Sequence, residues 1–185
     1  MSITAKGVVD FWRNAGPSRW FDRNDQFDQQ CRSGFLEAHH AAARREHDDW
    51  VERDAESALA LLILLDQIPR NVFRGSAHSY ATDPLARHYA RRALELGHDQ
   101  RIEPALRAFF YLPLEHSEDP ADQARSVELH RALPADADGN DAAQWAVQHQ
   151  QIIERFGRFP HRNAALGRAT TAEEQIYLDG GGFKG

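Results

Sequence analysis

The sequence contains one cysteine, Cys31, so an intramolecular disulfide and a zinc site built from several cysteines are both excluded. Lysine is nearly as scarce, because Lys6 and Lys184 are the only two and arginine carries almost all the positive charge. The longest apolar run, ALALLILL, is far shorter than the roughly 20 residues that span a bilayer. The N-terminal stretch MSITAKGVVDFWRNAG lacks the basic-then-apolar pattern of a secretory signal. We therefore expect a cytoplasmic protein with no membrane partner.

Charge and size narrow the class of protein further. The formal net charge is −6, and a general nucleic-acid surface needs clustered positive charge, so we expect no nucleic-acid partner. The chain is 42% hydrophobic and 27% charged, which is ordinary for a folded globule. Its 185 residues fit one domain, so residues 1–185 are predicted to form a single domain. The tail from about residue 179 is expected to be flexible, although its Phe183 could dock on the domain.

Apolar residues recur with helical spacing, and no stretch alternates with a period of two, so we predict an all-α fold of about eight helices. Short connections favour antiparallel helix pairs. A helix over residues 48–67 becomes apolar on all sides, which is typical of a central buried helix. Asp83 is expected to cap the next helix, with Pro84 at its first position. Pro113 is expected to break a short helix.

Further elements are predicted toward the C-terminus and near the N-terminus. The stretch GNDAAQWAVQHQQIIERFG reads as one long amphipathic helix with Trp145, Ile152 and Phe156 facing inward. Thr171 and Glu174 have the spacing of a capping box. Near the N-terminus, a helical stripe of phenylalanines includes Cys31, which we expect to be an inert core residue. The histidines in the polar stretch around it (His39, His40 and His47) are expected to lie on the surface.

The segment LLDQIPRNVFRG carries the strongest polar signal. Asp66 lies at the C-terminal end of a buried helix, where the helix dipole disfavours it, so it should have an arginine partner. Pro69 is expected to end that helix, because it biases the residue before it away from the α region. Asn71 suits a left-handed or turn conformation, and Gly75 gives the chain freedom to bend.

A second segment, FPHRNAALGR, repeats the order of proline, Arg-Asn, three residues and glycine. If the two turns converge, their arginine forks and asparagine amides would line one polar pocket suited to a phosphate or carboxylate. Alternatively, each Arg-Asn pair satisfies carbonyls at a helix end. The candidate ligand-binding residues are Asp66, Gln67, Arg70, Asn71, Arg74, His116, Arg162, Asn163 and Arg168.

A third segment, FFYLPLEHSEDP, offers acid–base groups. His116 beside Glu115 or Glu118 could act as a general base with its orienting carboxylate, and the catalytic candidates are His116, Glu118 and His161. Three acidic groups before a helix start also suit its dipole without any function. No His-Glu-x-x-His or comparable spacing is present, so we expect neither a metal nor a cofactor.

Five segments occur here in one order: WFDRNDQFD, LLDQIPRNVFRG, ATDPLA, FFYLPLEHSED and RFGRFPHRNAALGR. Together they resemble the bacterial family known as domain of unknown function 924, from about residue 7 to residue 178. The resemblance implies an all-helical, tetratricopeptide-like fold, and it supplies no reaction.

Three hypotheses for function remain open. The first is a protein that binds a small anionic ligand, with or without catalysis. The second is a tetratricopeptide-like module that grips a peptide, including its carboxylate, in a groove lined by aromatic residues such as Trp12, Trp20 or Trp50. The third gives the Asp–Arg and His–Glu pairs a purely structural role. The sequence does not indicate an oligomeric state.

Overall fold

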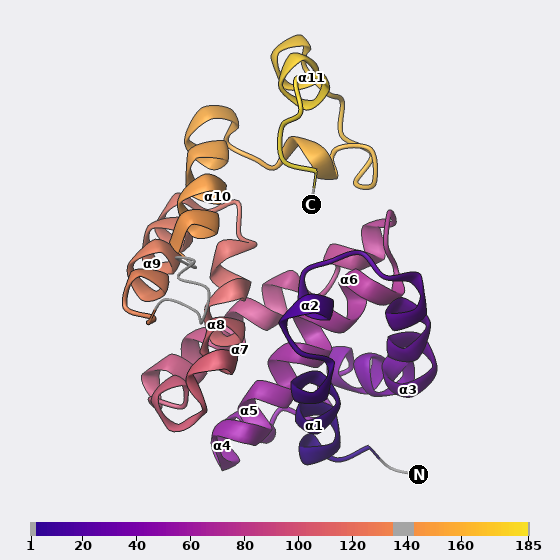
Figure 1. Cartoon of the computed structure of the whole chain (residues 1–185), viewed down its shortest axis with the longest axis vertical. Coiled ribbons are helices and arrows are strands. Elements are labelled where there is room, and N and C mark those ends of the chain that lie inside the picture. Colours follow the sequence, from indigo (N-terminus) through magenta and orange to yellow (C-terminus); the bar gives the residue numbers. More distant parts are fainter. Residues whose placement is uncertain (1–2, 135–142, 185) are drawn as a thin grey trace. The chain divides into compact units, whose positions relative to one another are not determined.

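The computed structural model describes residues 3–134 and 143–184, and these residues contain helices and turns but no strand (Figure 1). Eight of the α-helices have seven or more residues, so the all-α prediction is confirmed. Contacts group the chain into two compact units. The first unit is Met1–Arg74 with His78–Pro113, and the second is Gly75–Ala77 with Leu114–Gly185. The expectation of a single domain remains a prediction.

The helical elements follow one another through short connections. In chain order they are α1 (Ala5–Ala15), α2 (Pro17–Trp20), α3 (Asp25–Ala43), α4 (Trp50–Arg53), α5 (Ala55–Leu62), the π-helix η1 (Ile63–Gln67), α6 (Ile68–Val72), η2 (Ala77–Tyr80), α7 (Asp83–Glu95), η3 (Asp99–Arg101), α8 (Pro104–Glu115), α9 (Pro120–Arg131), α10 (Ala143–Phe156), η4 (Pro160–Arg162) and α11 (Ala172–Asp179). Among the described residues, none of these helices is both long and apolar enough to cross a membrane.

The core of the first unit is built around α5, as its uniformly apolar sequence predicts. Every residue of α5 except Glu56 is buried, and the helix packs against α1, α4 and α7. Helix α3 contributes Phe27, Cys31 and Phe35, which share one buried face. Burial raises the pKa of the Cys31 thiol to about 12, so this thiol stays protonated and its role in the core is confirmed.

Three predictions about helix starts and interruptions have different outcomes. Pro113 lies inside α8 and does not break it; the helix keeps its course because neighbours such as Phe109 and Phe110 are buried, and their packing outweighs one lost hydrogen bond. Thr82, not Asp83, holds the N-cap position of α7. The capping box of Thr171 with Glu174 is present at the start of α11.

The core of the second unit contains Ile152, Ile153 and Phe159. Phe156, Tyr177 and Phe183 pack against this cluster, so the predicted docking of Phe183 is confirmed. Trp145 was expected to face inward but is 61% exposed, because the buried face at this end of α10 is formed by Ala143 and Ala146 instead. The predicted start of this helix, at residues 139–142, lies outside the described residues.

Candidate functional site

The first Arg-Asn motif lies in α6 (Figure 1). This helix follows directly on the π-helix η1. Pro69 does not end the helix as predicted, since Ile68 before it has helical angles of −56° and −46°. The wider π-turn makes this possible: the Ile68 amide donates to the carbonyl of Ile63, five residues back. The carbonyl of Leu65, which an α-helix would pair with the missing N–H of Pro69, accepts from the Thr82 hydroxyl at 2.5 Å.

Four successive backbone carbonyls around η1 are satisfied by side chains. Those of Leu64, Leu65, Asp66 and Gln67 accept from His39 Nδ1, Thr82 Oγ1, Arg70 Nη1 and Asn71 Nδ2, at 2.8, 2.5, 2.7 and 3.0 Å. His39 is therefore buried, at 5% exposure, and its expected surface position is wrong. Sequence periodicity could not show this, because the partner of His39 is a carbonyl freed by a π-turn 25 residues later.

Arg70 supplies the partner that the buried Asp66 was predicted to need. Its guanidinium lies 3.1 Å from Asp66 Oδ1 and makes two hydrogen bonds to Asp83, at 2.9 and 3.1 Å. The carboxylates are 2% and 6% exposed, and Arg70 is 18% exposed. Burial disfavours the charged arginine, but Asp66 and Asp83 outweigh that effect and raise the pKa of Arg70. Gln67 Nε2 donates to Asp66 at 2.6 Å and completes this network.

Asn71 is helical, so its expected left-handed or turn conformation is wrong. Its side chain instead links the π-helix to Arg74: the amide nitrogen donates to the carbonyl of Gln67, and Oδ1 accepts from Arg74 at 3.3 Å. Arg74 in turn makes two hydrogen bonds to Asp28 in the first turn of α3, at 2.8 and 2.9 Å. Gly75 then bends the chain with a φ of 79°, as predicted.

The second motif, in the second unit, has an equivalent arginine clamp. Arg168 makes hydrogen bonds to both carboxylate oxygens of Glu118, at 2.8 to 3.0 Å, and its Nε donates to Asn163 Oδ1 at 3.0 Å. The Glu118 carboxylate also accepts from the Phe159 amide at 2.8 Å. Burial opposes the charge on Glu118, but the bonds from Arg168 and Phe159 outweigh it and lower its pKa. Glu118 is therefore ionised and held in place, which suits an anchor better than a catalytic acid.

Asn163 is completely buried, and its amide donates to Glu174 at 3.2 Å. Glu174 also accepts two hydrogen bonds from Arg158, at 2.6 and 2.9 Å, and one from the Thr171 amide at 2.7 Å. Arg158 in particular lowers the pKa of Glu174 to about 2. Asn163 thus connects the second motif to the start of α11.

Arg162 is the buried arginine of the second motif, at 6% exposure. Its Nη1 donates to the backbone carbonyl of His116 at 3.1 Å, and its guanidinium lies 4.4 Å from the centre of the Phe159 ring. The planar guanidinium is held on the ring face by a cation–π contact. This places a positive charge beside the segment that carries His116.

A buried carboxylate lies next to His116 in the chain. Glu115 is 3% exposed, and its oxygens lie 3.3 Å from His149 Nδ1 and 3.6 Å from His130 Nε2. The rings of His116 and His149 are 6.4 Å apart. The sequence reasoning missed His130 and His149. For His149 a signal exists, because Ile152 and Ile153 follow at the third and fourth positions and place it on the buried face of α10.

His161, from η4, completes this group of side chains. Its ring lies 5.6 Å from Phe159 and 5.1 Å from Phe183, and the Phe183 ring lies 4.6 Å from that of His149. His116 and His161 are half-buried, whereas His130 and His149 are buried. We call this group the His–Glu cluster; its members are Glu115, His116, His130, His149, His161 and Arg162.

The predicted site residues therefore form two sets. The first unit holds Asp66, Gln67, Arg70, Asn71 and Arg74, and the second unit holds His116, Glu118, His161, Arg162, Asn163 and Arg168. The hypothesis of one pocket built from both motifs stays a prediction. Within the described parts of the chain, no three or more His, Cys, Asp or Glu side chains are arranged to hold a metal ion.

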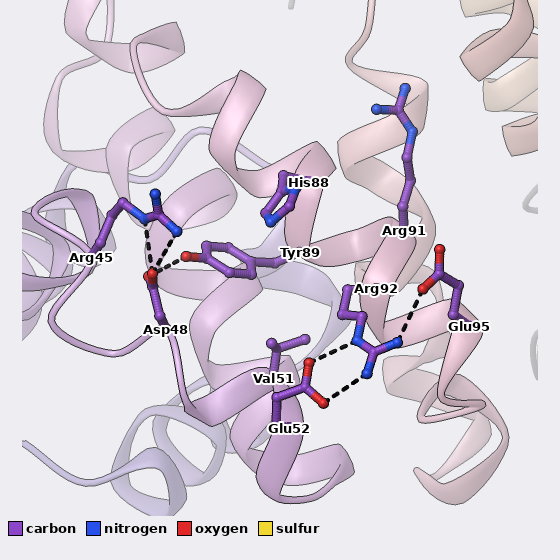
Figure 2. Close-up of a pocket in the computed structure, with 9 residues that line it drawn as sticks. All are labelled: Arg45, Asp48, Val51, Glu52, His88, Tyr89, Arg91, Arg92 and Glu95. Carbon is purple, nitrogen blue, oxygen red and sulfur yellow. Dashed lines mark hydrogen bonds and ion pairs between the residues drawn. The ribbon is translucent and has the colours of Figure 1, made fainter.

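The first unit also has a surface pocket of about 380 Å³ between α4 and α7 (Figure 2). None of the predicted site residues lines this pocket. Its carboxylates are paired within the pocket: Asp48 accepts from Arg45 and the Tyr89 hydroxyl, and Glu52 makes two hydrogen bonds with Arg92, at 2.7 and 2.9 Å. The carboxylates of this pocket are therefore paired with side chains of the pocket itself. We therefore place the candidate functional site at the His–Glu cluster.

Fold and cluster together define an all-helical protein with a buried histidine–carboxylate group. The chain belongs to the family of bacterial proteins of unknown function DUF924, which it matches over residues 8–182. It is similar to the protein of unknown function ATU0120 from Agrobacterium tumefaciens, with 53% sequence identity and a TM-score of 0.89, over 95% of this chain and 97% of that one. A comparison with curated proteins finds no match.

Proposed function

We propose that the protein binds a small anionic molecule at the His–Glu cluster of the second unit. The observation that carries this proposal is the burial of Glu115 between His130 and His149, next to the half-buried His116 and His161. Burying ionisable groups costs free energy that apolar residues of similar size would not, so such clusters concentrate at functional sites.

The hydrogen-bond donors of the cluster support an anionic ligand. Arg162 brings a guanidinium that cannot lose its proton, and two imidazoles, His116 and His161, are accessible enough to donate hydrogen bonds. Glu174 is held by Arg158, and Glu118 is held mainly by Arg168 with a further contribution from Arg162. A phosphate or carboxylate is the chemistry that such a set of donors recognises best.

The cluster also has the parts of a proton-transfer site. A carboxylate that contacts an imidazole orients it and stabilises its protonated form. Glu115 Oε1 lies 3.3 Å from His149 Nδ1, which also bonds the Trp145 carbonyl at 2.8 Å, and the His149 ring lies 6.4 Å from that of His116. We therefore infer His116 and His161 as the acid–base candidates, and Glu118 as the anchor that fixes the chain between α8 and α9.

A thermal-shift screen of the purified protein tests this proposal. The panel contains inorganic phosphate together with phosphorylated and carboxylated metabolites, and the variants are His116→Gln, His161→Gln and Arg162→Lys. A ligand at 100 times its Kd adds about 2.7 kcal/mol, which raises the Tm by several degrees. His88→Gln, in the pocket of the first unit, is the matched control. A hit lost in the three variants and kept in the control supports the site; hits that survive in all of them, or no hit, contradict it.

A tetratricopeptide-like peptide module is the second candidate. Two tryptophans that this hypothesis assigned to a groove, Trp12 and Trp50, are buried at 0% and 5% exposure, and Trp20 donates to the carbonyl of Trp12. The exposed Trp145 is a contact that such a module would still offer. Capture of a peptide by the wild type and not by Trp145→Ala would favour this reading. A cytoplasmic location, without nucleic-acid or membrane partners, belongs to both readings and is tested by cell fractionation.

A further inference from the structure

The C-terminal segment places an aromatic ring on the His–Glu cluster. The phenyl ring of Phe183 meets His149 at 4.6 Å with an interplanar angle of 66°, and His161 at 5.1 Å with an angle of 81°. Both are edge-to-face arrangements, the geometry that aromatic pairs prefer. The Phe183 amide donates to the Tyr177 hydroxyl at 3.0 Å, which fixes the backbone beside the ring. The two histidines therefore form a slot for a flat ring.

Two glycines, Gly181 and Gly182, bring the ring to this position. Gly181 has a φ of 85°, a conformation that side chains rarely adopt, and the Gly182 amide donates to the Tyr177 carbonyl at 2.9 Å. A Cβ on Gly182 would lie 2.6 Å from two ring atoms of Tyr177 and 2.6 Å from its carbonyl oxygen. The Gly-Gly-Gly sequence thus permits this close approach to α11, and a side chain at Gly182 would exclude it.

The slot and the positive charge share one neighbour, the Phe159 ring. His149 and His161 lie 5.4 and 5.6 Å from it, and the Arg162 guanidinium lies over its face at 4.4 Å. His161 and Arg162 are also consecutive in the chain. An anionic group attached to a ring in the slot would therefore find a guanidinium and an imidazole close by.

We propose that the slot between His149 and His161 binds the aromatic ring of an aromatic carboxylate or phosphate, and that Phe183 is its built-in, displaceable occupant. This inference rests on the function proposed above and names the ligand class of the same site. Segment 180–184 must then undock before the ring of the ligand enters. Docked Phe183 lowers the apparent affinity for aromatic anions in proportion to the fraction of molecules in which the slot is open. A small anion without a ring does not compete with Phe183.

Calorimetric titration with phenyl phosphate, benzoate and inorganic phosphate tests the inference. The variants are Phe183→Ala, which empties the slot, and Gly182→Ala, which keeps the ring but blocks the close approach to Tyr177. Lys184→Ala is the matched control on the same segment. Since the contacts of Phe183 with both histidines are removed, we expect phenyl phosphate to bind about tenfold more tightly to both variants, with inorganic phosphate and the control unchanged. Benzoate shows whether a carboxylate serves as well as a phosphate.

The imidazole proton resonances provide a readout without ligand. Ring currents from Phe183 should shift the His149 and His161 signals in the wild type, and both variants should lose these shifts. Adding phenyl phosphate to the wild type should replace them. If inorganic phosphate binds but the affinity for phenyl phosphate is no higher in either variant than in the wild type, the slot is refuted and the anion site stands. If neither variant changes the imidazole signals, the docking argument is refuted; if no anion binds any form, both proposals fail.

Discussion

The two Arg-Asn motifs have the same order of residues but different partners. In the first motif, Arg70 and Asn71 of α6 both donate to carbonyls one turn back, those of Asp66 and Gln67 in η1. In the second, the Arg162 donor reaches the backbone of His116, 46 residues away. The carbonyl contacts of Arg70 and Asn71 therefore repair a local interruption of a helix, whereas the carbonyl contact of Arg162 joins segments that are distant in the chain. The last arginine of each motif, Arg74 or Arg168, reaches a distant carboxylate in both cases.

The two motifs nevertheless share one arrangement of side chains. In each motif the asparagine Oδ1 accepts from the last arginine, Arg74 or Arg168, and that arginine clamps a carboxylate that lies at or just before the start of a helix. Acidic groups are favoured there by the helix dipole, and the arginine fork fixes them further. The repeated sequence thus encodes one structural unit, and the residues around it determine whether the unit stays purely structural.

The largest effect is expected for Arg70→Ala. Removing this guanidinium leaves Asp66 and Asp83 buried without it, so we expect the free energy of unfolding to fall by about 3–5 kcal/mol. Arg168→Ala should cost only about 1 kcal/mol, because Arg168 and Glu118 are 22% and 31% exposed. Urea unfolding measures both. Equal losses would contradict the difference between the two motifs.

A triple variant separates the loss of the ion pairs of Arg70 from the cost of leaving carboxylate charges buried without that arginine. Adding Asp66→Asn and Asp83→Asn to Arg70→Ala removes the two buried carboxylate charges, so part of the lost stability should return. If the triple variant is less stable than Arg70→Ala, the hydrogen bonds of the aspartates to other groups matter more than their charge.

The helical fold could be predicted from the sequence, because burial of apolar residues repeats along the chain and leaves a periodic pattern. The buried partner of Asp66 could also be predicted, since the cost of an isolated charge applies in any fold. The fate of Pro69 could not, because it depends on a π-turn and on the Thr82 hydroxyl, which pairs with a residue 17 positions away. His130 was missed for the same reason: a lone histidine on a helix shows its role only when Glu115 is placed against it.

The two asparagines give the next largest contrast. Asn163→Ala removes a hydrogen bond to the ionised Glu174 from a completely buried position, so we expect a loss of roughly 1.5–3 kcal/mol. Asn71→Ala removes a bond to a neutral carbonyl, that of Gln67, and should cost about 1 kcal/mol; the bond from the last arginine of the motif is lost in both variants and does not distinguish them. Chemical denaturation of the two single variants decides the matter, and an Asn71 loss larger than that of Asn163 would reverse our interpretation.

The loss of stability at acidic pH should depend in part on Glu174, which the second motif holds through Asn163. Glu174 has a folded pKa of about 2, below its ordinary value of 4.5, so its ionised form stabilises the fold above pH 4.5. That stabilisation is lost as the pH falls toward 2. Glu174→Gln keeps the shape of the side chain but removes the charge opposite Arg158, so it should be less stable than wild type at pH 7. Unfolding curves at several pH values should converge for Glu174→Gln and wild type near pH 2; a constant gap would contradict this assignment.

The smallest effect should be the same in both motifs. Gly75 and Gly167 have φ values of 79° and 64°, and a Cβ on either would have no other atom within 4 Å. Alanine therefore costs only backbone strain, about 1 kcal/mol at each position, and asparagine should cost less because it tolerates the left-handed conformation. Thermal unfolding of the four single variants gives the comparison. Equal costs would show that the motifs share their backbone turn and differ in the partners of their side chains; a clear inequality would mean that the turns themselves differ.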